Sequence, residues 1–244
     1  MNCKTILLTG ILLVAGIFSL SAQDTSGGTS LVRTQISLGW HAYHKRQAEN
    51  QAVFNGPMYM DYPFRPVQNQ YVPSGDWESG QVTLGGETFT HLWLKWDASR
   101  DQLVARGYHS HEQIVVQQRA LDSFRIGTHD FVHIYQPLGL YYGLYPGFFD
   151  RLYTGTSSVY AHYSKNLQSQ IHTNLEYTFQ ERTDLYISEG GRFWRVDRKR
   201  ELLALFPAYK HQIKRYWRQH HLKFSRNKAL ALSSWALWHD QQSH

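Results

Sequence analysis

Cysteine is almost absent from this sequence. Among its 244 residues there is one, Cys3, and it lies in an amino-terminal segment that we expect export to remove. Without Cys3 the chain has no disulfide, no catalytic thiolate and no cysteine-ligated metal site. Small exported domains often depend on disulfides for stability. We therefore expect this protein to depend on its hydrophobic core, for which the remaining chain is long enough.

Long apolar runs are absent after residue 22. The segment before it combines Lys4 with an apolar run from Ile6 to Leu20 and small residues up to Ala22, which is typical of a secretory signal peptide. The run has about 15 residues, whereas a membrane-spanning helix needs about 20. We predict that residues 1–22 are cleaved and that the protein is exported to the periplasm, the outer membrane or the cell surface. No transmembrane span is expected after cleavage.

Charged residues are few and aromatic residues are many. Charged side chains make up 18% of the chain and aromatic ones 15%, with 16 Tyr and 8 Trp. Tyr and Trp favour pleated, half-buried surfaces, so the composition favours β structure over a helical bundle. Packing in the core and across strands explains these rings more simply than a carbohydrate-binding surface does.

The domain organisation follows from composition shifts near the amino terminus. Residues 24–30 are polar and glycine-rich, which is typical of a flexible segment. We interpret residues 23–43 as a flexible leader that includes a first strand. Residues 44–244 are expected to form a single β-rich domain with helices from about residue 198.

The spacing of turn signals predicts an α+β fold that is mostly antiparallel β. Residues 81–84 and 87–90 flank Gly85-Gly86, a pair that suits a two-residue hairpin turn and places Val82 opposite Phe89. Residues 92–96 are apolar on both faces, which predicts a strand inside the sheet. Further strands are expected at 103–106, 113–117, 123–126, 131–135, 148–153, 158–163, 185–187 and 192–196. Short strands with turns every 8–12 residues are typical of a sheet, sandwich or barrel, here closed by the C-terminal helices.

Three helices are predicted after the last strand. Asp197 is expected to cap a short helix that ends near Phe206, and Pro207 suits the first turn of a second helix reaching about residue 220. Ser225 is expected to cap the third. In the second helix a buried stripe is expected from residues that recur every four positions, namely Tyr209, Ile213 and Trp217. The inner side of the third is expected to carry Leu230, Ser233, Leu237 and Trp238.

Motifs with defined chemistry are weak. His109 and His111 lie next to Glu112, but zinc needs three or four ligands and no clear further one follows. Residues 97–101 resemble the start of a calcium loop, which Gln102 and Tyr108 then interrupt, so a turn is the better interpretation. There is no nucleophile elbow and no phosphate or dinucleotide loop. The sequence therefore predicts no catalytic, metal or cofactor-binding residue.

Charge is distributed unevenly along the chain. Residues 192–228 contain 12 Lys or Arg against Asp197 and Glu201. On the second predicted helix, Lys210, Lys214 and Arg218 share one face, opposite the buried stripe. Such a face attracts anionic partners, which in an exported protein would be lipid head groups, lipopolysaccharide or an acidic protein, whereas nucleic acid is not expected. A solvated helix exterior is the simpler alternative for the same pattern.

Several segments resemble a family of functionally uncharacterised exported proteins of Bacteroidetes-type bacteria. The resemblance rests on the pattern of Trp, Gly and apolar residues from Trp77 to Leu103, on residues 147–155 (GFFDRLYTG, where the family has GFYEVLYEG), and on residues 191–196 and 222–224. It extends over most of Trp77 to Trp238. The resemblance implies export, a β-rich body and C-terminal helices, and it transfers no catalytic residue.

Two functions remain open from the sequence. The first is a non-enzymatic binding or envelope-associated protein that acts through the basic helical end. The second is a secreted hydrolase of glycans or cell-envelope material. An enzyme would require a pocket where two or more Asp, Glu or His side chains converge.

Overall fold

The fold is described from a computed structural model of the chain. The structure describes residues 52–107, 112–135, 144, 146–171 and 175–242. All of them belong to the unit that spans residues 47–244, so the predicted signal peptide and leader lie outside the described residues. Within the described ranges, the helices are too short or too polar to cross a membrane.

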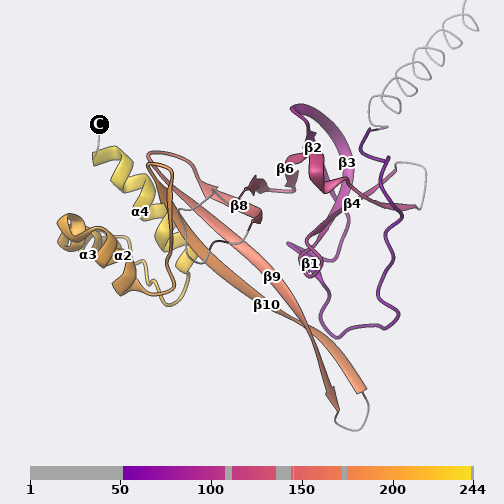
Figure 1. Cartoon of the computed structure of the whole chain (residues 1–244). Helices are drawn as coiled ribbons and strands as arrows, with labels where there is room; N and C mark the ends of the chain where they lie inside the picture. The colour runs from indigo at the N-terminus through magenta and orange to yellow at the C-terminus, as the bar shows by residue number, and fades with distance from the viewer. Residues whose placement is uncertain (1–51, 108–111, 136–143, 145, 172–174, 243–244) are drawn as a thin grey trace, which may run out of the picture. The chain divides into compact units, whose positions relative to one another are not determined.

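The described residues form one antiparallel sheet of eleven strands, followed by helices towards the C-terminus (Figure 1). Its strands are β1 (Tyr71–Val72), β2 (Glu78–Leu84), β3 (Glu87–Asp97), β4 (Gln102–Arg106), β5 (Gln113–Val115), β6 (Leu121–Ile126), β7 (His129–Ile134), β8 (Gly147–Tyr153), β9 (Ser157–Ile171), β10 (Leu175–Glu189) and β11 (Arg192–Arg195). Their order is β11-β10-β9-β8-β7-β6-β2-β3-β4-β5, and β1 pairs with β3. The mostly β, α+β fold expected from the sequence is confirmed.

The glycine turn between β2 and β3 sets the register of this part of the sheet. Gly85 and Gly86 have φ angles of +55° and +85°, the left-handed region that glycine adopts at low cost. Val82 lies opposite Phe89 as predicted. β3 pairs with β2 on one side and with β4 on the other, so the apolar stretch at residues 92–96 does lie inside the sheet.

Two strands, β9 and β10, are longer than the short strands predicted from the sequence. β9 and β10 have 15 residues each and pair along their whole length, from Ser157 opposite Glu189 to Ile171 opposite Leu175 (Figure 1). The sequence indicated only the parts of these strands nearest β8 and β11. Residues 164–184 are mostly polar and contain no glycine or proline to mark a turn, although Leu175, Tyr177 and Phe179 alternate with polar residues as they do in a half-buried strand.

The helices are α2 (Lys199–Leu205), α3 (Lys210–Gln219) and α4 (Lys228–Gln242), with a 3₁₀ turn at Pro207–Tyr209 before α3. Two predicted caps are wrong. The carboxylate of Glu201, rather than Asp197, accepts the backbone N–H groups at the start of α2, at 2.8 and 3.0 Å. Asn227, rather than Ser225, caps α4 by accepting the N–H of Leu230 at 2.9 Å.

Two hydrophobic clusters hold most of the core. One lies among β2, β3, β4, β6, β7 and β8 and is built around Trp96, Phe124 and Phe131. The other joins β9 and β10 to the helices and is built around Trp217 and Trp235. Helix α4 packs against β9 and β8, which fixes the helical end of the chain to the sheet.

The predicted inner side of α4 is wrong. Leu230 is 52% exposed and Leu237 is 45% exposed. The side that faces the core instead carries Ala231, Leu232, Trp235, Ala236, His239 and Asp240. Small and polar residues contribute to this face because the helix lies close to the β8–β9 turn, so leucine positions alone did not identify it.

Candidate functional site

Helix α3 presents the basic row predicted from the sequence. Ile213 and Trp217 are buried, and Tyr209 is half-buried in the turn before the helix. Lys210 and Arg218 are exposed, while Lys214 is partly exposed. In the described part of the chain, no ion pair joins any of these three cations to an acidic side chain.

Contacts made by Trp217 hold α3 in this orientation. Its indole Nε1 donates a hydrogen bond to the carbonyl oxygen of Ala231 in α4, at 3.1 Å. Its ring lies 5.6 Å from that of Phe224, and the Nζ of Lys199 lies 5.2 Å from the ring centroid, a cation–π contact. The apolar side of α3 is therefore fixed, and its cations are left towards solvent.

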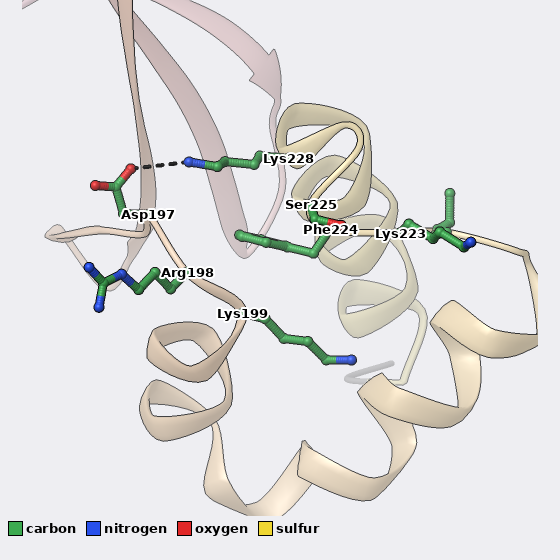
Figure 2. Close-up of a pocket in the computed structure, with 8 residues that line it drawn as sticks. Asp197, Arg198, Lys199, Lys223, Phe224, Ser225 and Lys228 are labelled. Atoms are coloured by element: carbon green, nitrogen blue, oxygen red, sulfur yellow. Dashed lines mark hydrogen bonds and ion pairs between the residues drawn. The ribbon is translucent and has the colours of Figure 1, made fainter.

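A pocket of about 550 Å³ lies at the starts of α2 and α4 (Figure 2). Its lining comes from the β11–α2 connection, the α3–α4 connection and the first residues of α2 and α4. The residues are Asp197, Arg198, Lys199, Leu222, Lys223, Phe224, Ser225 and Lys228. Four cationic side chains and one carboxylate make this pocket strongly basic.

The single carboxylate of the pocket is already paired. Asp197 contacts the Nζ of Lys228 at 3.4 Å and a guanidinium nitrogen of Arg195 at 3.2 Å. Both pairs are substantially exposed to solvent, so each contributes little to stability. Pairing with Asp197 leaves Arg198, Lys199 and Lys223 as the cations available to a partner.

These cations do not converge on a single point. In Figure 2, Lys228 reaches towards Asp197, whereas Arg198 and Lys199 point in opposite directions. A site for one small anion would direct several donors at the same position. The arrangement suits an extended anionic surface better. We refer to the pocket cations and the α3 row together as the basic helical surface.

Carboxylates and imidazoles meet elsewhere, at buried positions. Asp150 on β8 contacts the Nδ1 of His129 at 2.6 Å and accepts hydrogen bonds from the hydroxyl of Tyr163 at 3.1 Å and the N–H of Asp130 at 3.2 Å. The hydrogen bond with Asp150 raises the pKa of His129, against the opposing effect of burial. Asp150 is 2% exposed and its contacts tie β7, β8 and β9 together, while the His129 side chain is 33% exposed.

A second polar cluster fastens the end of α4 to the β8–β9 turn. The Oγ of Ser157 lies 3.2 Å from the Nδ1 of His239 and 3.3 Å from a carboxylate oxygen of Glu189. Asp240 accepts hydrogen bonds from the hydroxyl of Tyr153 and the N–H groups of Thr156 and Ser157, at 3.0 to 3.2 Å. The Ser157 side chain is fully buried, so a serine–histidine contact here is structural.

A third carboxylate and imidazole lie near the start of β8. The Oδ2 of Asp101 and the Nε2 of His162 are each 3.5 Å from the position that a Cβ on Gly147 would occupy. Burial raises the pKa of Asp101 and lowers that of His162, so both neutral forms are favoured. The indole of Trp96 donates to Asp101 at 3.2 Å.

The sequence suggested two weak metal sites, one at His109 and His111 and one at residues 97–101. His109 and His111 lie outside the described residues. Residues 97–100 form the predicted turn, in which the Oδ1 of Asp97 accepts the N–H groups of Ser99 and Arg100 at 2.9 and 3.0 Å. Among the residues that the structure describes, no three His, Cys, Asp or Glu side chains are grouped so as to hold a metal ion.

Sequence reasoning located the basic end but missed the pocket within it. Arg198, Lys199, Lys223 and Lys228 belong to the stretch whose positive charge was counted, yet they lie in two segments more than 20 residues apart. Only the packing of α2 against α3 and of α3 against α4 brings the two segments together.

Comparison of the chain with family models, curated proteins and solved structures finds no match.

Proposed function

We propose that this protein is an exported, non-enzymatic binding protein that attaches to an anionic component of the cell envelope through its basic helical surface. Export is proposed from the charged start, apolar run and small residues of segment 1–22. The partner class is proposed from charge. Membrane-surface phosphates, whether of phospholipid head groups or of lipopolysaccharide, are the envelope component that this surface fits best.

The observation that carries the proposal is the concentration of positive charge on the last strand and the helices that follow it. Residues 192–228 contain 12 basic and 2 acidic residues, a net charge of +10, while the whole chain has a net charge of +6. Both acidic residues are engaged locally, Asp197 with Arg195 and Lys228, and Glu201 with the start of α2. The net charge of this stretch therefore attracts anionic partners.

The spread of the cations supports a surface as partner rather than a small ligand. Juxtamembrane basic residues each contribute about 1 kcal/mol of attraction to an anionic bilayer and need no fixed geometry. Arg198 and Lys199 point in opposite directions (Figure 2), an arrangement that serves this kind of binding. A partner protein with an acidic face is the alternative that the same charges would allow.

The experiment is a sedimentation assay with vesicles. The protein is mixed with vesicles of phosphatidylglycerol and phosphatidylcholine, with vesicles of phosphatidylcholine alone, and with lipopolysaccharide. We expect binding to the anionic vesicles and to lipopolysaccharide, and a loss of binding as salt rises beyond about 150 mM, where the screening length is about 8 Å. The variant Lys210→Gln, Lys214→Gln, Arg218→Gln should lose binding without a change in melting temperature.

Two results would overturn this proposal. Equal binding of wild type and variant to anionic vesicles would show that the α3 cations are not used. No binding of the wild-type protein to either anionic surface would show that lipid phosphates are not the partner. Binding of an acidic envelope protein under the same conditions would then indicate that the partner is a protein.

The hydrolase alternative remains a prediction from sequence. It required a pocket in which Asp, Glu or His side chains converge, and the pocket of Figure 2 contributes one such residue, Asp197. The buried groups around Asp150 and Ser157 have few exposed atoms. Release of reducing sugar from envelope glycans, abolished by replacement of Asp101 or His162, would be the result that favours this alternative.

A further inference from the structure

The outer half of the β9–β10 hairpin has a free backbone edge. β8 pairs with β9 at Val159, Tyr160 and Ala161, and the N–H of Lys165 donates to the carbonyl of Ala98 at 3.3 Å. From residue 166 to residue 171, β9 pairs with β10 on one side only, as far as the described residues show. The far edge of β10 is covered at this level, because it bonds to Val67 and Gln68, so the unpaired backbone groups lie on the β9 side.

This edge also lacks the features that normally prevent strands from pairing between molecules. Edge strands are usually protected by charged side chains, proline or bulges. Residues 166–171 (NLQSQI) contain neither charge nor proline, and they pair with β10 without a bulge. All six residues are exposed, with Leu167 at 43% and Ile171 at 81%.

The outward hydrogen-bonding groups can be assigned from the pairing. In an antiparallel strand, successive residues direct their N–H and C=O groups to alternate sides. The N–H of Lys165 points away from β10, because it reaches Ala98. The N–H and C=O groups of Leu167, Ser169 and Ile171 therefore point away from β10 as well, along the free edge.

We propose that this edge pairs with the same edge of a second copy of the chain. The two β9 strands run antiparallel about a two-fold axis at Ser169. Ser169 then exchanges two backbone hydrogen bonds with its counterpart, and Leu167 lies opposite Ile171 of the second copy. The same pairing occurs twice, as the symmetry of an isologous interface requires, and it joins apolar side chains on one face.

The register between the two β9 strands follows from which backbone groups of the edge are free. An axis at Gln168 would place Ile171 opposite Lys165, whose N–H is already bonded to Ala98. The axis at Ser169 uses only free groups between residues 167 and 171 and matches apolar with apolar residues at both Leu167–Ile171 pairs. Because the shared edge is short compared with interfaces that bury 1,200 Å² or more, we expect a reversible dimer that depends on protein concentration.

The test measures molecular mass against concentration for the full protein and two variants. Sedimentation equilibrium over a range on the order of 1 to 100 µM should show a monomer–dimer equilibrium for the wild type. Ser169→Pro removes the N–H on the axis, and proline is tolerated in an edge strand when its nitrogen faces solvent. This variant should raise the dissociation constant at least about tenfold, whereas the control Ser169→Ala, which keeps the N–H, should leave it unchanged.

A cross-linking measurement fixes the register and does not depend on the proline variant. In a Cys3→Ser background, Ser169→Cys places two cysteines on the axis with their Cα atoms about 5.5 Å apart, within the range of a disulfide. Mild oxidation should give a covalent dimer, and the control Gln168→Cys should form it at least about ten times more slowly. A wild-type protein that stays monomeric at every concentration would overturn the proposal, and so would a dimer that Ser169→Pro leaves intact.

Discussion

Charged side chains have different surroundings in the strand region, from β2 to β8, and in the helical region, from α2 to α4. In the strand region, two carboxylates are buried and saturated with donors. Asp97 accepts from the hydroxyl of Tyr59 at 2.8 Å and from two backbone N–H groups. Asp150 binds His129, Tyr163 and a backbone N–H. Burial raises the pKa of Tyr59 to about 12, so its hydroxyl stays protonated and remains a donor.

In the helical region, cations are numerous, exposed and largely without acidic neighbours. The core beneath them consists of tryptophan, phenylalanine and aliphatic side chains, and Lys210, Lys214 and Arg218 are not part of it. Exposed like charges spaced along one helix face repel weakly and do not help the helix form. The buried carboxylates of the strand region thus support the fold, whereas the cations of α3 lie towards solvent.

The largest expected effect is at a buried carboxylate of the strand region. Asp150→Ala leaves the His129 ring, the Tyr163 hydroxyl and a backbone N–H without their acceptor. Removing one member of a buried polar pair costs about 3–5 kcal/mol. Urea unfolding should show this loss, while Asp130→Ala, which removes a more exposed carboxylate paired with arginines, should cost about 1 kcal/mol or less. Similar losses of unfolding free energy for the two variants would show that the buried carboxylate is no more important to stability than the exposed one.

A smaller effect is expected at the turn that sets the strand register. Gly85→Val and Gly86→Val each place a β-branched residue at positive φ, where no steric contact is present but the backbone itself is strained. We expect each to lower the unfolding free energy by more than about 1 kcal/mol. Gly85→Asn is the matched control and should cost less, since asparagine tolerates this region. Neutral valine variants would mean that the turn does not constrain the register.

The contribution of His129 should depend on pH. Its folded pKa is raised, chiefly by the hydrogen bond with Asp150 and also by the charges of Asp150 and Glu78. The stabilisation is therefore fully present below the unfolded value of about 6.5 and is lost as pH rises through the folded pKa. Wild type should lose stability relative to His129→Gln across that window. A constant difference between the two proteins from pH 5 to pH 9 would show that the imidazolium form is not what Asp150 stabilises.

The sequence predicted those parts of the fold that local patterns specify. Gly85-Gly86 marked a turn because few residues adopt positive φ, and the β3 stretch at residues 92–96 marked an inner strand because both its faces are apolar. The outer half of β9 could not be predicted in this way, because residues 166–171 are exposed on both faces and carry no periodic signal. In the outer half of β10 the alternation of Leu175, Tyr177 and Phe179 was a signal that the interpretation missed, and Phe179 is buried there.

The exposed cations of α3 were predicted, because their position depends on one helix. The pocket was missed, because it depends on packing between helices. Ile213 and Trp217 fix the buried side of α3, so the position of Lys210 and Arg218 followed from a spacing of four residues. The pocket depends on contacts between segments distant in sequence. The cap at Asn227 was missed for a different reason, because Ser225 and Asn227 are both good N-cap residues and only the structure shows where α4 begins.

The most direct measurement of the central claim compares two variants with the same change in net charge. Lys210→Gln with Arg218→Gln removes two exposed cations from the helical region, and Arg65→Gln with Arg119→Gln removes two exposed cations from elsewhere. Both should keep the wild-type stability within about 0.5 kcal/mol, as exposed substitutions usually do. If the helical region is the binding surface, the first pair should weaken binding to phosphatidylglycerol vesicles at least about tenfold and the second should leave it nearly unchanged. Equal losses for the two pairs would show that net charge alone governs binding and would contradict the account.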